Sequence, residues 1–281
     1  MAEPFAMAIC RHLRVEDKQT TSRSSAFLDA CRQFNAGEIE RSKLLSITEA
    51  RGFNNVIDAF HIVAGADVPD RFFHDERGTS DGVRVTDNFN RLLEAAGGGD
   101  IGNENEARWR LVETAWRLEI GSSMLATYEE TTGALLLPDR HRRRTSVTSS
   151  RAALNGYQQG RCFYCSSQIS TSDLATLADV DHFFPHTLKR TEIGQAVDGV
   201  WNLVLACRWC NRGSGGKFDK VPAEYLLERL HARNEFLIGS HHPLRETLIM
   251  QTGLTEGARR SFLRDFDGRA VRHLVHRWRP T

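Results

Sequence analysis

Four of the six cysteines fall into two pairs whose spacing suits the binding of one metal ion. The pairs are Cys162-Phe-Tyr-Cys165 and Cys207-Arg-Trp-Cys210. Each CxxC turn offers two thiolates, and four thiolates match the tetrahedral coordination of Zn²⁺. Two disulfides or two redox pairs are the alternatives. We favour a structural zinc ion, because the N-terminus lacks the features of a secretory signal and the cytosol keeps thiols reduced.

A second group of polar residues lies between the two cysteine pairs. Apolar residues around Val180 and at 203–206 predict two strands. The dipeptide Asp181-His182 then falls at the end of the first strand, and Asn202 opens the second. The second cysteine pair runs into a glycine-rich turn and then toward helix. The sequence therefore predicts a compact finger of two strands and one helix.

This arrangement resembles the HNH nuclease family, whose core is called the ββα-metal finger. The resemblance spans residues 150–235 and is carried by CxxC, DHxxP, NLxLxC, CxxCN and a following lysine, in that order. Segment 200–211 looks especially like family members associated with bacterial restriction and phage defence. The resemblance implies a metal-dependent endonuclease that hydrolyses phosphodiester bonds in DNA and acts in bacterial defence against foreign DNA. The alternative is a zinc-stapled module that binds nucleic acid or a partner without cutting.

The resemblance also implies a role for each motif residue. His182 is the expected general base, and a pKa near 6.5 suits imidazole to that role. Asp181 and Asn211 are the expected ligands of a catalytic Mg²⁺ or Mn²⁺, because hard cations prefer oxygen ligands. Asn202 is expected to hydrogen-bond the loop between the strands and to keep His182 aimed. Lys217 is expected to contact a phosphate as a point cation.

Several assignments have alternatives in the same segment. Asn211 could cap the start of a helix instead of binding metal. His186 lies four residues after His182 and is a further candidate metal ligand, the first to consider if Asn211 does not bind the cation. Relatives usually place the lysine closer to the last motif residue, whereas six positions separate Asn211 from Lys217. Further candidates for phosphate contacts are Arg190, Arg208 and Arg212.

The composition predicts the scaffold that must position these residues. The chain has 281 residues, of which 40% are apolar and 26% charged, with a mean hydropathy of −0.42. These values exclude a disordered or collagen-like chain, and no apolar stretch is long enough for a membrane span. We expect an α+β fold, mostly α, with a helical N-terminal region and a C-terminal ββα-metal finger flanked by helices. Cys10 and Cys31 are expected to be buried. Helices are expected at 25–35, 38–64, 104–131, 147–159 and 255–278, with a loop at 65–85.

The charge is divided unevenly along the chain. Residues 1–140 hold 16 basic and 23 acidic residues, and residues 141–281 hold 21 and 13. With the basic run at 138–146 as the boundary, we expect two domains. We expect residues 1–140 to form an acidic, mostly helical recognition domain. It would bind a protein partner or a second copy of the chain. Residues 141–281 form a basic nuclease domain that binds double-stranded DNA. A cytoplasmic location without membrane contact is expected.

Overall fold

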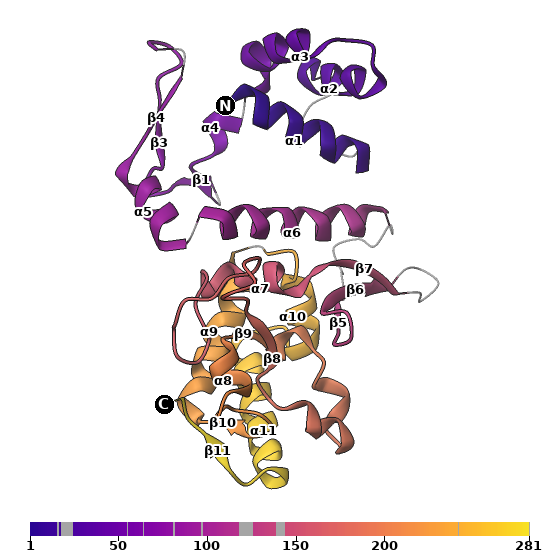
Figure 1. Ribbon diagram of the computed structural model, residues 1–281, viewed down its shortest axis with the longest axis vertical. Coiled ribbons are helices and arrows are strands. Elements are labelled where there is room, and N and C mark those ends of the chain that lie inside the picture. Colours follow the sequence, from indigo (N-terminus) through magenta and orange to yellow (C-terminus); the bar gives the residue numbers. More distant parts are fainter. Residues whose placement is uncertain are drawn as a thin grey trace. The chain divides into compact units, whose positions relative to one another are not determined.

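The computed structural model describes residues 1–281 apart from 16, 18–24, 55, 64, 81, 97, 118–125, 139–143, 241 and 281. The architecture is α+β and mostly helical, as the sequence predicts, and the strands form small sheets of two or three strands (Figure 1). The chain divides into two compact units, Met1–Ala95 and Ala96–Thr281, which are described separately.

The first unit is built on a small helical core. Its helices are α1 (Ala2–Val15), α2 (Ala26–Ala36), α3 (Arg41–Ile47), the π-helical turn η1 (Thr48–Gly52) and α4 (Val56–Ala59). The predicted helix at 25–35 is confirmed, and Ser25 caps it by accepting a hydrogen bond from the Leu28 backbone N–H at 3.3 Å. Cys10, Cys31 and Leu44 are buried together in this core, so the prediction for the two cysteines is confirmed.

The predicted loop at 65–85 is wrong. It contains strand β2 (Ala66–Asp67), which pairs with β1 (Ile62–Val63), and the antiparallel strands β3 (Phe73–Asp75) and β4 (Val83–Val85). These strands are too short to show alternation in the sequence. Arg77, in the turn between β3 and β4, donates hydrogen bonds to Asp75 and Asp58 and so ties the hairpin to α4. Helix α5 (Asp87–Ala96) follows.

The second unit begins with a long helix and a three-stranded sheet. Its first elements are α6 (Gly98–Arg117), β5 (Thr127–Glu129), β6 (Ala134–Pro138), β7 (Arg144–Ser149) and α7 (Ser150–Gln158). The expected helix at 104–131 therefore ends early, since 127–129 is a strand, and residues 118–125 lie outside the described part. The expected linker at 138–146 is also different, because Pro138 pairs with Arg144 across two antiparallel strands. Residues 139–143 lie outside the described residues.

Contacts divide the chain at Ala95/Ala96, whereas the sequence suggested a boundary near residue 140. The difference arises from α6. Its Ala107 and Leu111 are buried in the same core as Leu154 of α7. The acidic segment 1–140 is therefore shared between the two units.

The segment with the predicted strands folds as an antiparallel pair followed by a short helix. Strand β8 (Asp179–His182) pairs with β9 (Leu203–Ala206), with His182 opposite Leu203. All four residues of β9 are buried, which explains its unbroken apolar run. Helix α8 (Arg208–Arg212) follows directly. The connection between the strands contains three 3-10 turns, η2 (His186–Arg190), η3 (Gly194–Ala196) and η4 (Val200–Asn202).

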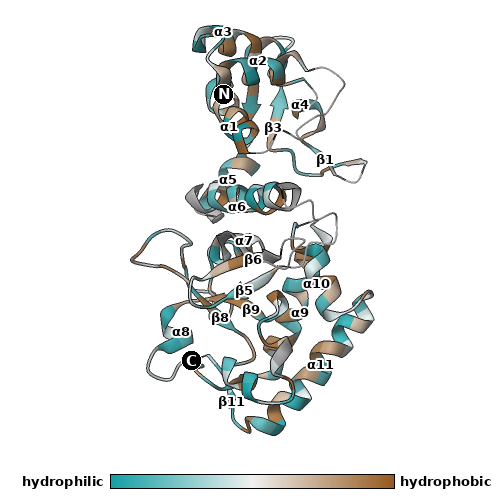
Figure 2. Cartoon of the chain, turned by 90° about the vertical axis from the view of Figure 1, so that its right-hand side faces the viewer, coloured by the Kyte–Doolittle hydropathy of each residue, from teal (hydrophilic) through white to brown (hydrophobic). Residues whose placement is uncertain are grey.

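Three C-terminal helices supply much of the core around this pair. They are α9 (Glu224–Gly239), α10 (Arg245–Thr252) and α11 (Glu256–His273), and α11 carries hydrophilic and hydrophobic residues along its length (Figure 2). Phe266 of α11 packs on Phe184 and Trp201, with ring centroids 4.9 Å apart in both pairs. The chain leaves α11 before Trp278, which lies in β11 (Arg277–Trp278), paired with β10 (Val221–Pro222).

Candidate functional site

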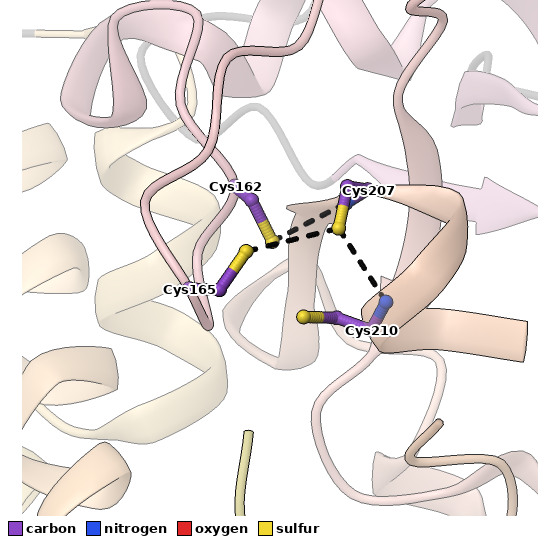
Figure 3. A group of neighbouring side chains, drawn as sticks. All are labelled: Cys162, Cys165, Cys207 and Cys210. Carbon is purple, nitrogen blue, oxygen red and sulfur yellow. Dashed lines mark hydrogen bonds between the residues drawn. The ribbon is translucent and has the colours of Figure 1, made fainter. Parts of the chain in front are cut away.

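The four cysteines of the two CxxC pairs meet at one point, between the turn after α7 and the start of α8 (Figure 3). All four are free thiols, and their Sγ atoms lie within 4.8 Å of one another. In a tetrahedron with Zn–S bonds of about 2.3 Å, neighbouring sulfurs are about 3.8 Å apart. The Sγ atoms of Cys165 and Cys207 are 3.8 Å apart. The cluster can hold one metal ion, and its donor set fits a structural zinc.

Backbone donors around the cluster point at the sulfurs. The N–H of Cys207 lies 3.2 Å from the Cys162 Sγ, and the N–H of Cys210 lies 3.4 Å from the Cys207 Sγ. Burial raises the pKa of Cys162 to about 11. For Cys165, hydrogen bonds beginning with that of Ser167 outweigh burial and lower the pKa to about 7. A cation at the centre is the natural compensation for four sulfurs held this close, because a metal binds thiolates.

Asp181 is buried on the inner face of β8. Its Oδ2 accepts a hydrogen bond from the Tyr164 hydroxyl at 2.6 Å, and its Oδ1 lies 3.3 Å from the Lys217 Nζ. Burial raises the pKa of Asp181, while Lys217 and Tyr164 oppose that rise. Both carboxylate oxygens are therefore engaged by other side chains.

Lys217 lies inside the fold and not at the surface where a phosphate would bind. Its side chain is fully buried, and Nζ donates to the backbone carbonyls of His182 and Phe218 at 2.9 and 3.2 Å. The glycine-rich turn causes this placement. Gly215 has a φ of +90°, and the Lys217 N–H donates to the Cys210 carbonyl at 2.7 Å, so the turn folds back under α8.

Asn202 holds the loop that follows β8. Its Oδ1 accepts from the Phe184 N–H at 2.8 Å, and its Nδ2 donates to the carbonyls of Phe184 and Val197 at 3.0 and 2.8 Å. The side chain is completely buried, so these bonds are not exchanged with water. The amide thus fixes the two ends of the segment between His182 and β9.

Asn211 contacts a residue that the sequence argument overlooked. Its Nδ2 donates to Oδ2 of Asp179 at 3.1 Å, and Arg212 Nε donates to the same oxygen at 2.9 Å. Asp179 is two residues before Asp181, so both point to one face of β8. This alternation was visible in the sequence Asp-Val-Asp-His. The candidate phosphate contacts Arg190, Arg208 and Arg212 are all exposed, and Arg212 is paired with Asp179 in this way.

His182 projects from the other face of β8 into a cluster of polar side chains. Only 6% of the residue is exposed. Its Nε2 lies 3.3 Å from Oδ1 of Asp198, although that approach lacks hydrogen-bond geometry and Nε2 has no hydrogen-bond partner among the described residues. Burial lowers the pKa of His182 to about 4, against the opposing effect of Asp198. The imidazole is therefore neutral near pH 7.

Two aromatic rings cover His182. The ring of Tyr128, from β5, meets it edge-on with centroids 5.6 Å apart, and the ring of His186 lies 5.5 Å away. His186 itself is turned to Glu130, with Nε2 and Oε2 3.1 Å apart. Tyr128 lies far from the recognisable motifs, and Asp198, four residues before Asn202, belongs to none of them, so the sequence did not indicate either residue.

Comparison with known proteins adds nothing to this geometry. The chain matches no family model, no curated protein and no solved structure. Within the part of the chain that the structure describes, no helix combines the length and the apolar character that crossing a membrane requires.

Proposed function

We propose that this chain is a metal-dependent endonuclease of the HNH type that hydrolyses phosphodiester bonds in DNA. The observation that carries the proposal is the environment of His182. Its imidazole is neutral, ends β8, faces the Asp198 carboxylate and belongs to the two-strand element next to the four-cysteine cluster. A neutral imidazole beside a carboxylate is suited to general-base catalysis.

In the proposed reaction, His182 takes a proton from the water molecule that attacks phosphorus. The new P–O bond forms as the bond to the 3′ oxygen breaks, and the leaving oxygen takes a proton from solvent water. The imidazolium that results is stabilised by the nearby Asp198 carboxylate. Asn202 contributes by holding the loop ends, so that His182 and Asp198 keep their relative positions.

Two kinds of metal belong to the proposal. Zn²⁺ at the four cysteines would have a structural role, stabilising the fold. A closed tetrahedral site leaves no open position where a substrate could bind the ion. Mg²⁺ or Mn²⁺ is assigned to Asp181 and Asn211 on their oxygen donors. These two residues do not form a cation site in the arrangement described, because Lys217 and Tyr164 engage Asp181 while Asn211 bonds to Asp179. The support for this cation is the donor chemistry alone.

The wider context of the proposal rests on the sequence. The basic residues 141–281 would bind double-stranded DNA, and the acidic residues 1–140 would bind a protein partner or a second copy. The resemblance of segment 200–211 supports a role in bacterial defence against foreign DNA, in the cytoplasm.

A non-catalytic, zinc-stapled binding module is the second candidate, and one contact favours it. The Lys217 ammonium sits beside Asp181, in the position where a nuclease of this type would need a divalent cation. An ammonium there neutralises the carboxylate and leaves the finger as a rigid binding element.

Nicking of supercoiled plasmid DNA by the full chain separates the two candidates. We expect cleavage with Mg²⁺ or Mn²⁺, its loss in EDTA, and its loss in His182→Ala, with zinc content and DNA binding near wild type. DNA binding without cleavage of plasmid, single-stranded DNA or RNA across a series of divalent metals would favour the binding module. Activity of His182→Ala within a few-fold of wild type would remove His182 from the mechanism.

A further inference from the structure

We propose that Asp198 is a positioning residue for His182: its carboxylate accepts the Nε2 proton and leaves Nδ1 as the atom that takes the proton from water. This inference rests on the proposed nuclease function and names a residue that no sequence motif indicates. Asp198 lies sixteen positions after His182, at the far end of the loop between β8 and β9.

The first argument is the surroundings of the His182 Nε2 atom. It is buried and has no hydrogen-bond partner among the described residues, and the Asp198 Oδ1 lies 3.3 Å away. A buried ring N–H without an acceptor costs about 1–3 kcal/mol. The carboxylate oxygen is thus the neighbour toward which a proton on Nε2 would be directed. The opposite tautomer would place the Nε2 lone pair against a carboxylate oxygen, which is unfavourable.

The second argument is that the backbone around Asp198 is fixed on both sides. The carbonyl of Val197 accepts a hydrogen bond from the buried Asn202 amide at 2.8 Å. On the other side, a Cβ added at Gly199 would lie 2.3 Å from the Trp201 Nε1. The chain is therefore closely packed at Gly199, and Asp198 is presented to His182 from a rigid support.

The third argument is the second oxygen of the carboxylate. Oδ2 of Asp198 forms an ion pair with the Nζ atom of Lys189, at the end of η2, while Oδ1 faces His182. An isolated surface ion pair would contribute little by itself. Here the ion pair orients the carboxylate, because each oxygen has a separate neighbour.

His186, the nearest competing side chain, does not take this role. Its Nε2 lies 3.1 Å from Oε2 of Glu130, so its polar edge is directed to β5. Its ring packs against the His182 ring, with centroids 5.5 Å apart. Asp198 is thus the acceptor available to the His182 Nε2.

The test uses the zinc-loaded full chain with Asp198→Asn, Asp198→Glu and Asp265→Asn. Asp265 is a matched control, since it pairs with Arg269 on α11 and is otherwise exposed. Nitrogen-15 NMR of the His182 ring at pH 7.5 reports the tautomer. We expect the Nε2–H form in wild type, in Asp198→Glu and in the control. In Asp198→Asn we expect a shift toward Nδ1–H, because the amide can donate to Nε2.

Plasmid nicking gives the second readout. In Asp198→Asn we expect kcat to fall by about 10²–10⁴-fold, as for carboxylates that orient a catalytic histidine. KM for DNA should change less than about twofold, and Asp198→Glu should recover part of kcat. A merely structural role would lower stability and leave the tautomer unchanged.

The outcomes separate this inference from the proposed function. An unchanged tautomer in Asp198→Asn, in a chain that cleaves DNA, overturns the role of Asp198 and leaves the nuclease proposal intact. If the tautomer shifts in Asp198→Asn but the wild-type chain never cleaves DNA, the nuclease proposal is overturned. The catalytic role of the His182–Asp198 pair is then overturned with it. Melting temperature and zinc content of each variant identify any change that is due to misfolding.

Discussion

The ammonium of Lys217 lies 3.3 Å from Oδ1 of Asp181, and both side chains are buried. Two opposite charges inside a small finger stabilise each other, and Lys217 also donates to the carbonyls of His182 and Phe218. The pair therefore links the end of β8 to the turn after α8.

We predict that Lys217→Met destabilises the second unit by about 3–5 kcal/mol, because it leaves the Asp181 charge buried and unpaired. The double variant Lys217→Met/Asp181→Asn should be less destabilised than the sum of the single variants. Urea unfolding of the four proteins measures the coupling. Strictly additive losses would show that the two side chains do not depend on each other.

The cysteine cluster predicts one zinc ion per chain. Cys207→Ser should lower zinc content and the melting temperature together, because metal binding supplies folding free energy to a small element. Cys31→Ala is the matched control: it removes a thiol that is also buried, but in the first unit, and should leave the zinc content unchanged. A wild type that stays fully folded without zinc would contradict the closed four-thiolate site.

The parts of this site that could be predicted are those encoded locally. Two CxxC pairs and an unbroken apolar run predict the cluster and β9, because spacing and burial act over a few residues. The inward course of Lys217 could not be predicted, since it depends on how the glycine turn folds back under α8. Asp198 and Tyr128 reach His182 through tertiary contacts, which leave no periodic signal. Strands β3 and β4 were not predicted, because they are too short to show an alternating pattern of apolar and polar residues.

The ring of Tyr128 packs edge-on against His182, whose imidazole is only 6% exposed. Removing that ring is therefore expected to make His182 more accessible. We predict that Tyr128→Ala increases the rate at which diethylpyrocarbonate modifies His182, and that it increases the rate of plasmid nicking. Tyr128→Phe keeps the covering ring and should match wild type. Tandem mass spectrometry assigns the modification to His182 or His186, and an unchanged rate at His182 would show that other groups bury it.

A substitution at Asn211 tests whether this residue is a metal ligand or a structural amide. If it binds the catalytic cation, Asn211→His should shift the ranking of cleavage rates toward Mn²⁺, Ni²⁺ or Zn²⁺ relative to Mg²⁺, because these ions bind imidazole better. We expect that shift. Asp179→Asn removes the charge that Asn211 contacts without adding a ligand, and should keep the ranking. An unchanged ranking in Asn211→His, with a stability cost of at most about 0.5–2 kcal/mol, would identify Asn211 as a helix-capping or strand-contacting residue.

The buried ring of His242 is expected to make the fold sensitive to acid. It is 1% exposed, its Nδ1 accepts a hydrogen bond from the Leu244 N–H at 3.1 Å, and burial, together with Arg108 and Arg233, lowers its pKa to about 3. Above the unfolded-state pKa of about 6.5, the ring is neutral in both states. Between about pH 6.5 and pH 3, the unfolded chain binds a proton that the folded chain does not, so the free energy of unfolding decreases as the pH falls.

We therefore predict that His242→Asn reduces the loss of stability between pH 7 and pH 5. The asparagine Oδ1 can replace Nδ1 as the acceptor for Leu244, and asparagine does not titrate in this range. Each full pH unit below about 6.5 should cost wild type about 1.4 kcal/mol more than the variant. Urea unfolding at several pH values measures the two slopes. Loss of zinc at low pH affects both proteins equally, so equal slopes would mean that the His242 ring takes up its proton without unfolding.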